Sequence, residues 1–122
     1  MKQISWLLFM GLTMLTSIGF AADCKNAGST AEIKLCANTE FNRADRELNS
    51  IYRKLLSSLD IEGQRKLKES QRAWLKFRDL NAGFVSDSWR GGNLEHLLFI
   101  DAKTQTTQAR TKQLQEIYEN RK

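Results

Sequence analysis

The sequence predicts an all-α fold, either a three-helix antiparallel bundle or a long helical hairpin, with one disulfide. Three observations favour this class. The 122-residue chain contains no proline, so the strongest helix breaker is missing from every segment. Apolar residues recur at intervals of three and four along three long segments, and no stretch alternates as a strand would. The connections between these segments are short, which favours antiparallel neighbours.

Residues 1–22 are predicted to be a secretory signal peptide, and residues 23–122 to be the mature domain. The first segment has Lys2 near its start, then an apolar run, then small residues, which is the pattern of a secretory signal. A small-x-small pattern predicts cleavage after Ala21, with cleavage after Ala22 as the alternative. The apolar run is short for a bilayer span, so no stable membrane insertion is expected after the signal is removed. A periplasmic or secreted location follows.

The mature part is large enough for one compact domain with one modest core. Without Lys2, 18 basic residues remain against 14 acidic ones, which gives a formal charge of +4. These charges are spread along the helical segments rather than gathered in one block. This distribution argues against a nucleic-acid partner.

The two cysteines, Cys24 and Cys36, are predicted to form a disulfide, because an exported protein folds under oxidising conditions. The bridge would close a loop of about a dozen residues, and the chain-entropy model assigns it about 3 kcal/mol. A metal site is the alternative, but two cysteines and the single histidine, His96, offer too few ligands. We expect no metal and no other cofactor.

The first helix is expected to start at a capping box, with Ser29 as the cap and Glu32 reaching back to it. Its apolar face continues to about Leu59, and residues 60–63 are expected to interrupt it. The residues of this face are Ile33, Phe41, Ala44, Leu48, Tyr52, Leu55 and Leu59.

The second helix is expected over residues 62–85, and the third from about Leu94. Between them, two glycines free the backbone, and Asn93 is expected to cap the third helix. The apolar stripe of the second helix is Leu67, Trp74, Phe77 and Leu80, and that of the third is Leu97, Ile100, Thr107, Leu114 and Ile117.

Polar side chains stand on or beside each apolar stripe. Gln71, Trp74 and Arg78 share one helical face because they are spaced by three and four residues. The other two segments present donors and acceptors in the same way. The resulting polar network is predicted to contain Asp45, Asn49, Tyr52, Gln71, Trp74, Arg78, Asp79, Thr107 and Arg110.

A buried charge is tolerated only when it is paired and hydrogen-bonded. We therefore expect Arg78 to meet Asp45, or Asp79 to meet Arg110, with the amide and hydroxyl groups of Gln71, Asn49 and Thr107 completing the network. In this interpretation the polar groups fix the register of the helices. The alternative is that they form a ligand or partner site.

The same residues carry a resemblance to a known family. D-x-x-L-N-x-x-Y begins at Asp45, Q-x-x-W-x-x-x-R-D begins at Gln71, and T-x-x-R begins at Thr107, with a Gly-Gly pair before the last motif. In these elements the chain resembles the LprI-type lysozyme-inhibitor N-terminal domain family, over nearly all of its mature part. The resemblance implies an exported, helical, cysteine-containing protein, and the family takes its name from lysozyme inhibition.

The chain departs from the pattern of that family in two places. The family usually carries a second cysteine pair, and here the corresponding positions resemble Ala82 and Ala102. The Gly-Gly-Ser of the family becomes Gly91-Gly92-Asn93, a mild change because Asn also caps helices. The absence of the second bridge weakens the expected attachment of the third helix.

A lysozyme inhibitor would block a carbohydrate cleft that is lined with catalytic carboxylates. The candidate partner-binding residues are Trp89, Arg90, Gly91, Gly92 and Asn93. Trp89 would supply a stacking anchor, and Arg90 would bind a carboxylate. The alternative is that Trp89 packs against the bundle as an ordinary core residue.

The expected function is binding of a protein, most directly inhibition of a lysozyme, another peptidoglycan hydrolase or a secreted toxin. A chain near +4 would be repelled by a strongly basic animal lysozyme, whereas a less basic bacterial wall hydrolase avoids this problem. The alternative function is a periplasmic adaptor or an immunity protein that binds an envelope or toxin protein. An exposed patch around Phe84, Trp89 and Leu94 would favour any of these binding functions.

Catalysis is not expected. His96 is the only histidine, and no G-x-S-x-G, H-E-x-x-H or phosphate-binding glycine motif occurs. Glu69 and Asp79 could form a carboxylate pair in principle, but they stand nearly three turns apart on one helix. His96 is expected to be a capping or solvent-facing residue.

Overall fold

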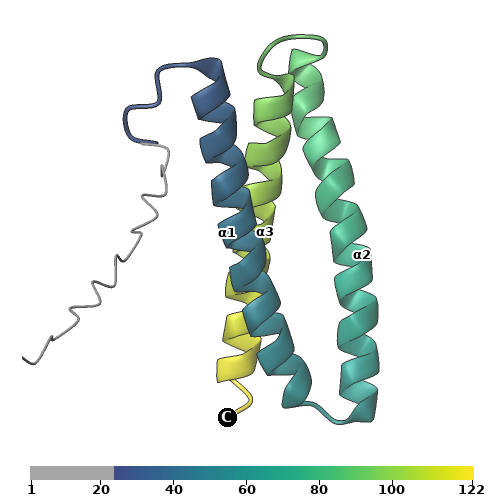
Figure 1. Ribbon diagram of the computed structural model, residues 1–122. Helices are drawn as coiled ribbons and strands as arrows, with labels where there is room; N and C mark the ends of the chain where they lie inside the picture. Colours follow the sequence, from purple (N-terminus) through teal and green to yellow (C-terminus); the bar gives the residue numbers. More distant parts are fainter. Residues whose placement is uncertain (1–23) are drawn as a thin grey trace, which may run out of the picture.

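The computed structural model describes residues 24–122, so the predicted signal peptide lies outside the described part. Three long helices, α1 (Thr30–Ser57), α2 (Ile61–Ser86) and α3 (Glu95–Glu119), account for most of it. A short 3₁₀ helix, η1 (Asp87–Trp89), joins α2 to α3. Each long helix runs antiparallel to the next (Figure 1), and α3 packs against both α1 and α2. The all-α prediction is confirmed, and the bundle is the form adopted.

Helix α1 begins at the predicted cap. The Ser29 hydroxyl accepts a hydrogen bond from the backbone N–H of Glu32 at 3.1 Å, and the Glu32 carboxylate accepts one from the N–H of Gly28 at 3.1 Å. Both bonds satisfy donors that the helix itself leaves unpaired. The predicted disulfide is also confirmed, since Cys24 and Cys36 are bonded with a sequence separation of 12. It ties the segment before α1 to the second turn of the helix.

The turn between α1 and α2 is shorter than the predicted interruption. Only three residues separate the two helices, because the Asp60 side chain accepts a hydrogen bond from the N–H of Gly63 at 2.8 Å and starts α2 at once. A Cβ at Gly63 would lie 3.0 Å from Asp60 Oδ1 and 3.2 Å from Leu59 Cβ. Residues 60–63 are therefore the start of α2 rather than a break.

The start of α3 differs from the prediction at Asn93. The cap position is Leu94, which makes no side-chain capping bond. Instead, the carboxylate of Glu95 accepts a hydrogen bond from the N–H of Gly91 at 2.7 Å. Gly91 has a φ of 74°, a conformation that favours glycine. An acid in the first turn of α3 thus binds the loop, and Asn93 is left exposed.

The core lies along α3, which packs against both other helices, whereas α1 and α2 touch each other little. Its centre consists of Leu48, Leu55, Leu67 and Leu114, all buried. Partly buried side chains surround this centre, among them Tyr52 and Trp74. The third helix is therefore the element that holds the bundle together.

Two residues predicted for the core of α2 are on its surface. Phe77 is 56% exposed and Leu80 is 65% exposed. The buried face of α2 instead includes Gln71, Arg78 and Ala82. Each residue rotates the side-chain direction by about 100°, so Phe77 and Arg78 cannot face the same neighbour. Ile33 and Ile117, also predicted as apolar-face residues, are exposed as well.

Candidate protein-binding site

Arg78 occupies a buried position that links α2 to α1. Its Nε lies 2.9 Å from Asp79 Oδ1, and its Nη1 lies 3.7 Å from Asp45 Oδ1. The Arg78 side chain is 9% exposed, whereas those of Asp45 and Asp79 are 41% and 53% exposed. The buried guanidinium is therefore compensated by two acids that stay in contact with water, which reduces the cost of burying the pair.

Aromatic rings enclose the same guanidinium. Its Cζ lies 5.3 Å from the centre of the Phe41 ring and 5.4 Å from that of Trp74. Lys103 of α3 adds a second cation, with Nζ 4.5 Å from the Phe41 ring centre and 3.7 Å from Asp79 Oδ1. These distances are typical of cation–π contacts. All three helices thus contribute to one mixed cluster.

The roles of Phe41 and Lys103 in this cluster were not predicted from the sequence. The sequence pattern placed Phe41 on an apolar face and gave no role to Lys103. A signal was present, since Phe41 stands four residues before Asp45 and Lys103 four residues before Thr107. This spacing places each of them on the same helical face as a member of the polar network.

Arg110 makes contacts with α2 other than the expected one. Its Nε donates to Gln71 Oε1 at 3.1 Å and its Nη2 donates to Ser70 Oγ at 2.8 Å. Asp79 is engaged by Arg78 and Lys103 instead. Burial lowers the pKa of Arg110 from its ordinary value. Because the guanidinium binds Gln71 Oε1, the amide nitrogen of Gln71, Nε2, points away from Arg110.

Two buried donors in the network lack a hydrogen bond to any group in residues 24–122. They are Arg78 Nη1 and Thr107 Oγ1. Thr107 is fully buried, so its hydroxyl is not in contact with bulk water. Asn49 is exposed and donates to Asp45 Oδ2 at 3.3 Å, while Tyr52 packs against the leucine core. The network is thus only partly satisfied.

The second group of candidate residues lies at one end of the bundle, where the end of α2, η1 and the start of α3 meet (Figure 1). Large apolar side chains are exposed there. Phe84 is 80% exposed, Trp89 is 51% exposed and Leu94 is 43% exposed. We call Phe84, Trp89, Arg90 and Leu94 the tip surface. Scattered exposed apolar residues are normal, but a group of this kind is typical of interaction sites.

The loop that carries Arg90 is a closed turn. Arg90 Nε and Nη2 lie 2.8 Å and 2.5 Å from Asp87 Oδ1, so its guanidinium is already paired within the loop. The N–H of Gly92 donates to the Trp89 carbonyl at 2.9 Å. Because the Arg90–Asp87 pair is largely exposed, it contributes little stability and can exchange for another carboxylate.

The charge of the tip differs from that of the whole chain. Between residues 81 and 99 the charged side chains are Asp87, Arg90 and Glu95, which give a formal charge of −1. The whole sequence carries +5. The positive charge therefore lies elsewhere on the bundle. His96, also near the tip, is exposed.

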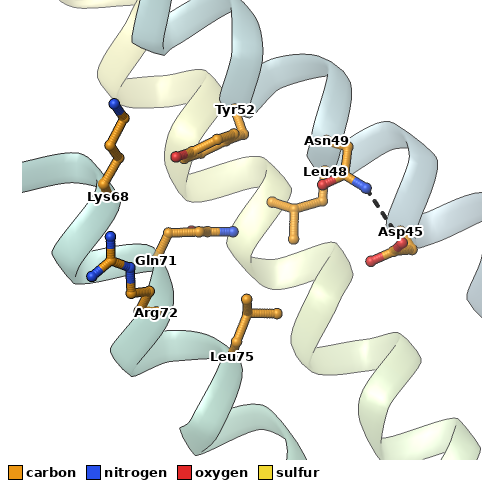
Figure 2. A pocket seen from close by; sticks show the side chains of 8 residues that line it. All are labelled: Asp45, Leu48, Asn49, Tyr52, Lys68, Gln71, Arg72 and Leu75. Carbon is orange, nitrogen blue, oxygen red and sulfur yellow. Dashed lines mark hydrogen bonds between the residues drawn. The ribbon is translucent and has the colours of Figure 1, made fainter. Parts of the chain in front are cut away.

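A separate groove lies between α1 and α2, with a volume of about 310 Å³. Figure 2 shows side chains from both helices facing it. Its lining residues are Asp45, Leu48, Asn49, Tyr52, Lys68, Gln71, Arg72 and Leu75. Half of these belong to the polar network, so the network and the groove share one region of the bundle.

Two further findings concern residues 24–122 as a group. None of their helices is long and apolar enough to cross a bilayer. They also contain no group of three or more histidine, cysteine, aspartate or glutamate side chains placed to hold a metal ion.

Comparisons with known proteins identify the family. The family model described as lysozyme inhibitor LprI matches residues 21–114. The chain is also 31% identical over 111 residues to an uncharacterized protein of Rhizobium meliloti (strain 1021), with 80% of each chain covered. No solved structure matches the chain significantly. With a match over most of its length, the chain belongs to the LprI lysozyme-inhibitor family.

Proposed function

We propose that this protein is an exported, non-catalytic inhibitor of a lysozyme or another peptidoglycan hydrolase, and that it binds the enzyme through the tip surface. Membership of the LprI family supports the class of function. The exposure of Phe84 and Trp89 supports the location. This exposure is the observation that carries the proposal, because the fold gives these two aromatic side chains no core to fill.

The shape of the tip suits a concave partner. A hydrolase cleft is open enough to hold a polysaccharide and carries catalytic carboxylates. The tip is the narrow end of two helices joined by a short turn (Figure 1). Buried aromatic and arginine side chains supply most of the binding energy in typical protein interfaces. Trp89 and Phe84 would fill the cleft, and Arg90 would exchange Asp87 for a carboxylate of the enzyme.

The charge distribution reduces the electrostatic objection to a basic enzyme. A partner with many positive charges is repelled by the chain as a whole. At the tip, however, the formal charge is −1 over residues 81–99. Attraction between a negative tip and a positive enzyme surface orients the two proteins as they meet and slows their dissociation. A basic lysozyme would therefore approach the tip in preference to the sides of the bundle.

A cell-lysis turbidity assay tests both parts of the proposal. Purified mature protein is added to a panel of animal lysozymes and bacterial wall hydrolases. We expect slowed lysis by at least one enzyme, and about tenfold weaker inhibition with Phe84→Ala or Trp89→Ala, because hot-spot side chains have effects of this size. Ile61→Ala is the matched control, since Ile61 is 87% exposed at the start of α2, the opposite end of that helix.

The outcomes test the inhibitor function and the tip surface separately. No slowing with any enzyme of the panel would reject the inhibitor function and favour an adaptor or immunity protein. Inhibition that survives both tip substitutions would retain the function and reject the tip surface. For a basic lysozyme, added salt should leave binding unchanged or strengthen it, because salt screens the overall repulsion.

A further inference from the structure

The groove between α1 and α2 contains a buried amide whose donor is unused. Gln71 is 8% exposed, and its Oε1 accepts the hydrogen bond from Arg110. The Nε2 end therefore points the other way, into the groove (Figure 2). It makes no hydrogen bond within residues 24–122. This amide nitrogen is not among the buried donors that lack a partner, so it remains free to donate to an acceptor that enters the groove.

Two cations stand at the α2 edge of the same groove. Lys68 and Arg72 both line it, and neither forms an ion pair in the part of the chain that the structure describes. Like charges four residues apart on a helix repel each other. One turn earlier on α2, by contrast, Arg65 is paired with both Glu62 and Glu69. Lys68 and Arg72 are thus not compensated by acids of their own helix.

The side of the groove that α1 forms is apolar, and its one acidic side chain is already paired within the protein. Leu48 and the Tyr52 ring face the groove from α1, and Leu75 faces it from α2 (Figure 2). Asp45, the acid of this wall, lies 3.7 Å from Arg78 Nη1 and accepts the hydrogen bond from Asn49. That bond uses the Asn49 nitrogen, and the amide oxygen remains available as an acceptor. The negative charge nearest the groove is therefore compensated within the protein.

We propose that this groove binds the carboxyl-terminal end of a short peptide. The terminal carboxylate would lie between Lys68 and Arg72. The last peptide carbonyl would accept from Gln71 Nε2, and a peptide N–H would donate to Asn49 Oδ1. A small side chain would contact Leu48 and Leu75. A volume of about 310 Å³ is at the lower limit of typical ligand sites, which restricts the ligand to one or two residues.

This binding site goes beyond the proposed inhibition, since it uses neither the tip nor a hydrolase. The probe is N-acetyl-alanyl-alanine, added to the disulfide-bonded mature protein labelled with ¹⁵N, and the readout is the amide NMR spectrum. We expect shifts in the Gln71 side-chain amide and in residues 45–52 and 68–75. The same peptide with a carboxamide end should bind about tenfold more weakly, because it lacks the charge that strengthens the hydrogen bonds.

Charge-matched variants locate the site. Arg72→Gln is expected to weaken binding of the acid about tenfold, by loss of a charge-assisted bond. Lys112→Gln removes one positive charge from an exposed position of α3 outside the groove, and it should leave binding unchanged. Both positions are exposed, so both variants should fold.

Three results would overturn the proposal. The first is the absence of shifts with the acid, and the second is equal binding of acid and carboxamide. The third is an equal response to acetate or inorganic phosphate, which would show nonspecific attraction of anions by Lys68 and Arg72. Because this readout involves no enzyme, a failure here leaves the inhibitor function untouched, and the reverse also holds.

Discussion

Arg78 of α2 and Asp45 of α1 lie 3.7 Å apart, across the pair of helices that touch each other least. The contact is asymmetric, because the guanidinium is almost fully buried while the carboxylate remains in contact with water. Together with the Phe41 and Trp74 rings, it connects α2 to α1 without a continuous apolar interface. Substitution of Arg78 should therefore affect the whole bundle.

Arg78→Ala is expected to lower the free energy of unfolding by about 2 kcal/mol. The substitution removes a buried cation and its ring contacts, and the effect stays below that of a fully buried ion pair because both acids are partly exposed. Urea unfolding followed by circular dichroism measures it. Arg46→Ala, at an exposed position of α1, is the control and should change little. An unchanged midpoint for Arg78→Ala would show that the cluster does not stabilise the bundle.

Thr107→Val is expected to stabilise the protein by about 1 kcal/mol, because it removes a buried hydroxyl that lacks a partner and keeps nearly the same shape. Thr104 is the matched control. It is also buried, but its hydroxyl donates to the Ile100 carbonyl at 2.9 Å, so Thr104→Val should be neutral or destabilising. Thermal unfolding of the two variants side by side decides the matter. Equal effects would mean that the Thr107 hydroxyl is satisfied in solution.

Replacement of both Cys24 and Cys36 by serine is expected to loosen the start of α1 more than the core. The chain-entropy model assigns the bridge about 3 kcal/mol, but Ile33 and Leu35 near it are exposed, so this end of α1 can open locally. Hydrogen exchange should become faster over residues 30–36 and stay slow at Leu48 and Leu55. Uniformly faster exchange along α1 would instead indicate that the bridge supports the whole bundle.

The first turn of α2 should lose stability in acid. A hydrogen bond from Arg65 lowers the pKa of Glu62 below its ordinary 4.5. A lowered carboxyl pKa in the folded state stabilises the protein above the pKa of the unfolded state. This stabilisation is lost as the pH falls through the lower folded value. An NMR titration should place the Glu62 midpoint below 4.5, and Arg65→Gln should return it to the ordinary range. An ordinary midpoint in the unmodified protein would contradict the Arg65 contact.

Much of the candidate site could be predicted from the sequence as a set of residues, but its arrangement could not. The polar spacing on α2 correctly indicated that Gln71 and Arg78 share a buried face. The partners of Arg110 and Asp79 were not predictable, because the relative depth of two helices decides which of several acids and amides a guanidinium reaches. The exposure of Trp89 was likewise open, since a tryptophan after a helix can pack inward or outward.

The sequence by itself determined the three helices, those of their ends that it predicted to within two residues, and the disulfide. These features depend on local chemistry: the Ser29 cap, the Asp60 cap, the absence of proline, and two cysteines close together in the chain. Only the tertiary structure decided that Phe77 and Leu80 face solvent, that α3 packs against both α1 and α2, and that a groove opens between α1 and α2. A helical face is buried only when a neighbour covers it, and the sequence of one helix does not specify where that neighbour lies.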